Sequence, residues 1–213
     1  MKTIYAVFFT AAILNFSRSE AQTITVCAFS SYTNEAKLYQ SFSFDTESFR
    51  TIENIFGFGF DVRKKFVDEN FIVGLSAEYL SLKTHYSVSL YDIQDEFTIV
   101  PIELSSYFSI PISSETFYWN VGGGVGLYFG TRNFHSELAT TISQIPGIGI
   151  HIGSSFEYYL WENVGVRADI KFRDAQFEAT NTFFSSSDFS EDNYTSEIHV
   201  DGVLLSGGIV VRF

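Results

Sequence analysis

The residues best suited to catalysis are few and are scattered along the chain. Its 213 residues include four histidines, which stand far apart among abundant serine and glutamate: His85, His135, His151 and His199. In His135-Ser136-Glu137 the residue types of a hydrolytic triad are adjacent. Neighbouring residues of a strand point to opposite faces, so these side chains converge only if they lie within a loop. We therefore expect solvated loop residues here, and the sequence predicts a protein that is not an enzyme.

The sequence also contains no complete motif for binding a cofactor or a metal. Gly122-Gly123-Gly124 is followed by neither a basic residue nor a helix pattern, so it is not a phosphate-binding loop. We interpret it as small residues where a strand bends or an interior is crowded. Cys27 is the single cysteine, which excludes an internal disulfide framework and a cysteine-rich metal site. His151 is expected to face an interior near Glu157, and we predict no cofactor and no metal.

Charge and hydropathy exclude two further classes of protein. The formal net charge is −12, which excludes nucleic acid as a partner because phosphate binding needs a basic face. The mean hydropathy is +0.10, and after the first twenty residues no apolar run is long enough for a membrane helix. The 24 phenylalanines and 12 tyrosines favour strands and boundaries between apolar and polar media.

The first segment has the layout of a secretory signal. Met1-Lys2 supplies a positive start, residues 4–16 are largely apolar, and Ser19-Glu20-Ala21 places small residues where a signal peptidase reads. We predict a signal peptide over residues 1–21. Residues 22–35 are interpreted as an N-terminal lead-in or a competing first strand, and residues 36–213 as the main domain.

The elements that must position the remaining polar residues alternate with period two. Between Phe117 and Phe129, the odd positions are apolar except for Gly123, and the even positions are small, polar or tyrosine. Such alternation predicts strands with two different faces. Eight are expected, near residues 37–46, 52–66, 70–82, 100–110, 117–129, 147–160, 164–174 and 201–213. Tight breaks alternate with long polar stretches at 83–97, 131–146 and 178–199, which predicts an up-and-down antiparallel meander.

The chemistry of the two faces indicates which one is inside. The polar face carries charges of both signs, whose near-balance suits a closed, narrow interior because an unpaired buried charge is costly. On the two charged strands, 52–66 and 164–174, the apolar face carries charges only at Lys64 and Asp174, near the strand ends. This is expected if the face meets lipid, where a midplane Lys or Arg costs about 2–4 kcal/mol. Pro101 is placed at the outer rim. The predicted interior charge network comprises Glu53, Asp61, Arg63, Glu78, Glu103, Glu157, Arg167, Asp169, Lys171 and Arg173.

These features predict an all-β fold, an eight-stranded antiparallel up-and-down transmembrane β-barrel. A soluble ligand-binding barrel is disfavoured, because its apolar face would point inward. The aromatic residues expected near the tight-turn ends would form a girdle at one membrane interface: Phe66, Phe71, Phe108, Phe117, Trp119, Tyr158 and Phe213.

The last strand carries a resemblance to a known family. Ile209, Val211 and Phe213 alternate on one face and end in phenylalanine. This pattern resembles the C-terminal recognition strand that bacterial outer-membrane proteins present to their insertion machinery. The chain as a whole resembles the OmpA/OmpX-type eight-stranded outer-membrane β-barrel family. The resemblance implies a location in the outer membrane, lipid and insertion machinery as partners, periplasmic termini, three short periplasmic turns and four surface loops.

The function predicted is a structural, adhesive or envelope-interaction role, with a packed polar lumen and acidic surface loops. The longest loop is expected to contribute Asp188, Glu191, Asp192 and Glu197. Two alternatives stay open: a lipid-modifying hydrolase, because some small barrels of this class use His, Ser and an acid, and a narrow channel for small solutes. The sequence identifies no extracellular partner.

Overall fold

The computed structural model describes residues 23–41, 47–66, 70–88, 91–114, 116–135, 142–144, 146–184 and 191–213. Within these ranges no helix is long and apolar enough to cross a membrane. The predicted signal peptide and Asp188 lie outside the described residues, and the signal peptide stays a prediction.

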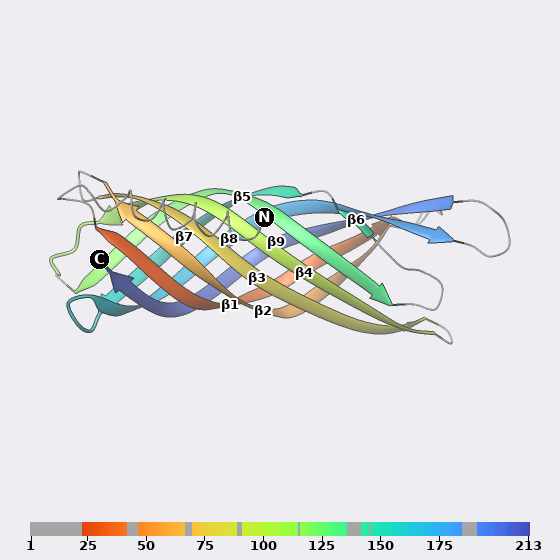
Figure 1. Cartoon of the computed structure of the whole chain (residues 1–213), viewed down its shortest axis with the longest axis horizontal. Helices are drawn as coiled ribbons and strands as arrows, with labels where there is room; N and C mark the ends of the chain where they lie inside the picture. Colours follow the sequence, from red (N-terminus) through yellow and green to blue (C-terminus); the bar gives the residue numbers. More distant parts are fainter. Residues whose placement is uncertain are drawn as a thin grey trace, which may run out of the picture.

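Eight long strands close into an antiparallel barrel, as the period-two pattern predicts (Figure 1). Each strand pairs with its neighbour in the chain, and the first pairs with the last, so the sheet has no open edge. A ninth, short strand pairs with β8 ahead of Pro146 and the start of β7. The strands are β1 (Ile24–Ser41), β2 (Glu47–Lys65), β3 (Phe71–Val88), β4 (Tyr91–Ile110), β5 (Phe117–His135), β6 (Ile142–Gln144), β7 (Gly147–Tyr159), β8 (Val164–Phe184) and β9 (Glu191–Arg212).

The first strand begins earlier than expected. From Ile24 onward the chain pairs with β2, and from Thr25 also with β9, so the interpretation of residues 22–35 as a lead-in is wrong for most of that segment. The alternation is weak there because both faces of β1 carry small side chains. Ser31 and Thr33 face the lumen, while Ala28 and Ser30 face outward. Hydrophobic contrast therefore misses a strand that backbone pairing requires to close the barrel.

The strands also extend farther beyond the predicted spans. β3 and β4 pair as far as Val88 and Tyr91, and β8 and β9 as far as Phe184 and Glu191. Much of the predicted loops 83–97 and 178–199 is therefore strand, and the β8–β9 hairpin reaches far to the right in Figure 1. The sequence of these extensions is rich in polar residues and lacks a clear period of two, while the pairing of the strands continues.

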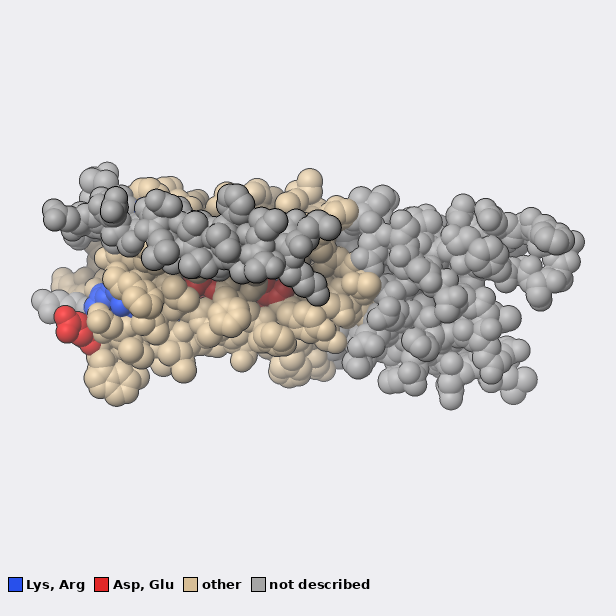
Figure 2. All heavy atoms as spheres, in the orientation of Figure 1, with Lys and Arg blue, Asp and Glu red and all other residues tan. Residues whose placement is uncertain are grey.

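The outward side chains form an apolar belt around the barrel, defined here as the outward residues between the levels of Ile148 and Tyr158 on β7. Phe56 is 67% exposed and Ile148 is 72% exposed. Leu127 and Ile170 are half exposed, whereas Asn120 is buried inside. The described surface in Figure 2 is accordingly free of charge over most of its area. The assignment of the two faces is confirmed. The girdle residues Phe66, Phe71, Phe108, Trp119, Tyr158 and Phe213 are exposed, whereas Phe117 is only partly exposed.

Pro101 lies at the end of this belt that is farther from the tight turns, and β4 continues beyond it to Tyr91. Pairing of β4 with β3 is interrupted between Ala77–Ile102 and Leu80–Ile99, where the proline supplies no N–H. On β5, a Cβ at Gly122 or Gly124 would collide with the β4 carbonyl oxygens of Ser106 or Leu104. The glycine run is thus needed for the close approach of β4 and β5.

Candidate functional site in the barrel lumen

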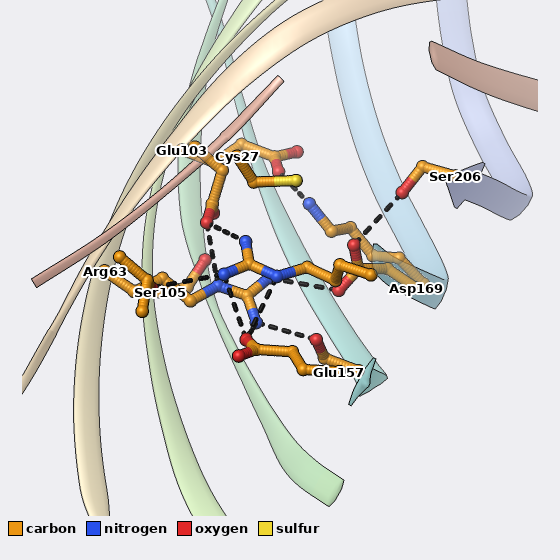
Figure 3. Close-up of polar contacts among 12 residues, drawn as sticks. Cys27, Arg63, Glu103, Ser105, Glu157, Asp169 and Ser206 are labelled. Atoms are coloured by element: carbon orange, nitrogen blue, oxygen red, sulfur yellow. Dashed lines mark hydrogen bonds and ion pairs between the residues drawn. The ribbon is translucent and has the colours of Figure 1, made fainter. Parts of the chain in front are cut away.

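The lumen contains a turn-side cluster of charges, which consists of Asp61, Arg63, Glu157, Arg167 and Asp169. Inward positions on β2, β7 and β8 place these side chains at neighbouring levels. Arg63 is 2.9 Å from Asp61 and donates to Asp169 at 3.0 Å, and Asp169 also accepts from Ser206 (Figure 3). Arg167 donates to Glu157 at 3.0 Å and also pairs with Asp61. Each guanidinium therefore has more than one carboxylate partner.

A middle cluster lies farther from the tight turns and consists of Glu78, Glu103, Lys171 and Arg173. Arg173 binds Glu78 at 2.7 Å and lies 2.8 Å from Glu103. Glu103 also pairs with Lys171 and accepts from the Tyr128 hydroxyl at 2.8 Å. Glu103 thus joins three strands of the wall, β4, β5 and β8. Nine of the ten network residues predicted from the sequence lie in these two clusters, while the side chain of Glu53 lies outside the described part.

Five carboxylates and four basic groups make up the two clusters. Burying a charge is costly unless partners replace its hydration, and each of these groups has at least one ionic partner. Arg63 also stacks on the Tyr107 ring, with its Cζ 4.2 Å from the ring centroid. The network therefore fills the width of the barrel with paired charge.

An apolar plug fills the next layer of the lumen, on the side of the middle cluster that faces away from the tight turns. It consists of Ala36, Ile55, Leu80, Phe97, Ile99, Tyr128, Ala175 and Val200, all buried. The period-two pattern does not predict this plug, because a polar inward face is expected along the whole strand. The available signal was parity: Leu80 follows Glu78, and Ile99 precedes Glu103, at inward positions of the same strands.

The sequence predicts His151 near Glu157, but in the structure His151 lies at the middle cluster. Its Nε2 is 2.8 Å from Ser105 Oγ, and its Nδ1 is 3.9 Å from Glu103 Oε2. Strand pairing explains the difference, because β7 sets His151 opposite Arg173 and Glu157 opposite Arg167. Serine, histidine and glutamate therefore come together here. The side chains of His135-Ser136-Glu137 lie outside the described residues.

The geometry around Ser105 does not match a working hydrolytic triad. The Nδ1 atom of His151 is buried with no hydrogen-bond partner among the described residues, whereas a triad needs the acid to bind that nitrogen. Ser105 and His151 are each 3% exposed, so both side chains are buried. The described residues of the chain contain no cluster of His, Cys, Asp and Glu side chains suited to a metal ion.

No family model and no curated protein sequence matches the chain. Among solved structures, the outer membrane protein OprG from Pseudomonas aeruginosa matches with a TM-score of 0.71 and 13% identity, over 91% of this chain and 96% of OprG. The chain has the fold of an outer-membrane β-barrel. The predicted fold is confirmed at that level.

Two further structures are similar to this barrel. The outer membrane protease OmpT from Escherichia coli has a TM-score of 0.55 and 6% identity, with 92% of this chain and 98% of OmpT covered. Neisserial surface protein A has a TM-score of 0.46 and 17% identity, with 89% and 97% covered. At these identities the likeness concerns the fold, so the function of the barrel has to be argued from its own residues.

Proposed function

We propose that this protein is an integral outer-membrane protein whose barrel is a closed, non-conducting scaffold. On this proposal it has no catalytic activity, and it presents its extended strands and acidic loops to the outside in a structural or adhesive role. The observation that carries the proposal is the filled lumen. Paired charges occupy the middle of the barrel and the apolar plug occupies the layer above them.

The dimensions of the belt support insertion in a membrane. On β7 the outward residues run from Ile148 to Tyr158, a span of eleven residues. That length is roughly 33 Å along the strand, and about 25 Å along the barrel axis at a tilt near 40°. An apolar band of about 25 Å is the height found in outer-membrane barrels. Among the outward charges of the described wall, Lys64 lies near the tight-turn end of β2. Asp174 and its cross-strand partner Asp201 lie toward the other end of the belt, where Asp201 pairs with Lys37 at 3.1 Å.

The number of strands supports a closed barrel. Eight strands enclose a space that side chains fill, whereas open aqueous pores need about 16–18 strands. The Arg63–Tyr107 stack and the Arg173 contacts to Glu78 and Glu103 span the lumen between different strands. Passage of ions would require several of these contacts to break together.

The outer part of the barrel supports a role at the cell surface. Glu191, Asp192 and Glu197 lie on β9 in the hairpin that extends beyond the belt, and Glu178 is paired in register with Glu197. An acidic outer rim favours partners with basic surfaces. Binding of whole cells to surfaces coated with basic or acidic polypeptide, with and without the protein, tests this part of the proposal. Equal binding in both cases would contradict an adhesive role.

Conductance tests the closed scaffold. Purified, folded protein in planar bilayers is expected to give no steady current steps, and heat-modifiable migration on gels serves as the check of folding. Reproducible large steps from the wild-type monomer would refute the packed lumen and favour a channel. Lipid hydrolysis is measured on the same preparation, with Ser105→Ala as the matched control. Activity that disappears in Ser105→Ala would establish the hydrolase alternative.

A further inference from the structure

A cavity of about 200 Å³ lies in the mouth of the lumen at the tight-turn end. It is formed by residues at or near the ends of six strands, β1, β2, β3, β5, β7 and β9. Those that matter for its chemistry are Arg63, Lys65, Tyr118, Glu157, Tyr159 and Arg212. This mouth cavity is separate from the packed middle cluster, and it takes no part in the scaffold role proposed above.

The charge on the cavity wall is unbalanced. Three cationic side chains line it against one carboxylate, that of Glu157. Both oxygens of Glu157 are already used, because Oε1 accepts from Arg167 at 3.0 Å and Oε2 accepts from the Tyr159 hydroxyl at 3.1 Å. Arg63 is likewise held by Asp61 and Asp169. Lys65 and Arg212 therefore supply the uncompensated charge of the cavity.

Neither Lys65 nor Arg212 forms an ion pair within the described ranges, and each is held on an aromatic ring instead. The Lys65 ammonium is 4.4 Å from the centroid of Tyr118, and the Arg212 guanidinium is 4.3 Å from the centroid of Tyr159. The two rings pack edge to face with centroids 5.7 Å apart. The two cations are thus positioned beside each other by one tyrosine pair.

Stacking on a ring holds a cation without using its N–H donors. In the described part of the chain, Arg212 donates to the Tyr118 hydroxyl and to the Glu162 carbonyl, and Lys65 makes no hydrogen bond. Two cations with unused donors beside a polar cavity are suited to an anion with several acceptor oxygens. The cavity volume admits a group of a few heavy atoms and excludes a whole lipid.

We propose that the mouth cavity is a binding site for a small anion that carries a phosphate or carboxylate group, held by Lys65 and Arg212. In the proposed orientation this end faces the periplasm, where such an anion is either a free solute or the headgroup of an inner-leaflet lipid. The position of Lys65 inside the lumen mouth favours the free solute. Its neighbour Lys64 points outward, 5.6 Å from the ring of Phe66, where a lipid headgroup would be reached.

The adjacent lysines provide a matched pair of variants. Binding of inorganic phosphate is measured by isothermal titration calorimetry on the full chain folded in a zwitterionic detergent, at low ionic strength. Lys65→Gln is expected to weaken binding about tenfold, which corresponds to about 1.4 kcal/mol, because it removes one charge-assisted contact to the anion. Lys64→Gln is expected to change the affinity less than about twofold. Heat-modifiable migration verifies that each variant is folded.

Two further arms complete the experiment. Tyr118→Leu keeps both cations but removes the ring under Lys65, and is expected to weaken phosphate binding in the same direction. In nanodiscs, phosphate affinity is compared with and without an anionic phospholipid. If the anionic lipid competes with phosphate and Lys64→Gln abolishes this competition, the anion binds at the outer surface and the proposal is overturned. Absence of phosphate binding to the wild type, or equal binding by Lys65→Gln, would also overturn it, whether or not the barrel conducts.

Discussion

Replacing Glu103 by glutamine should separate a buried network from a surface ion pair. Glu103 is 1% exposed and contacts Arg173, Lys171 and Tyr128 from three directions. Glu103→Gln keeps the size of the side chain but removes the charge. Arg173 retains Glu78, whereas Lys171 loses its only ion pair among the described residues. Removing one partner of a buried pair costs about 3–5 kcal/mol, because the remaining charge is left unpaired.

The double variant Glu103→Gln/Lys171→Met removes that unpaired charge. Its cost is expected to be about 1–2 kcal/mol, well below the sum of the two single variants, because an apolar replacement of a buried pair is often nearly neutral. The matched control is the Lys37–Asp201 pair, which has a similar separation of 3.1 Å but side chains that are 31% and 30% exposed. Asp201→Asn is expected to cost less than about 1 kcal/mol.

The assay is reversible unfolding in urea from lipid vesicles, followed by the fluorescence of the two tryptophans, Trp119 and Trp161. The free energy of unfolding is compared for the wild type, the single variants and the double variant. A cost below about 1 kcal/mol for Glu103→Gln would refute the reasoning. Strict additivity of the two single variants would refute it as well, because coupled charges must give a non-additive result.

Three other outcomes follow from the fold. Gly124→Val should prevent folding, because its Cβ would collide with the Leu104 carbonyl oxygen. Gly207→Ala should fold normally, since a Cβ there meets nothing within 4 Å. Heat-modifiable migration on gels compares the two variants. Deleting Phe213 should lower the amount of folded protein in outer-membrane fractions, and wild-type amounts would contradict the assembly signal predicted for Ile209, Val211 and Phe213. In a Cys27→Ala background, a cysteine at Leu127 should react with a membrane-soluble maleimide and one at Asn120 should be shielded, while equal reaction with an aqueous maleimide would contradict the assigned faces.

Much of the membrane-facing part of this protein follows from its sequence. Alternation places Leu127 outside and Asn120 inside without any tertiary information, because successive side chains of a strand point to opposite faces. The sign and number of inward charges also indicate a filled lumen, since charges such as Asp61 and Arg167 are stable there only as partners.

Tertiary structure decides what alternation cannot express. The pairing of β1 with β2 and β9 shows that most of residues 24–35 belong to the wall, although small side chains on both faces hide the pattern. The strands beyond the belt continue through polar sequence because backbone hydrogen bonds do not depend on hydrophobic contrast.

The shear between strands decides which inward residues meet. His151 lies beside Ser105 instead of Glu157. Lys65, on the ring of Tyr118, and Arg212, on the ring of Tyr159, line one cavity although they are far apart in the chain. A sequence pattern assigns each side chain to a face, whereas its height along the barrel depends on the register of every neighbouring strand. The faces were therefore predictable, and the pairs that form the network and the mouth cavity were not.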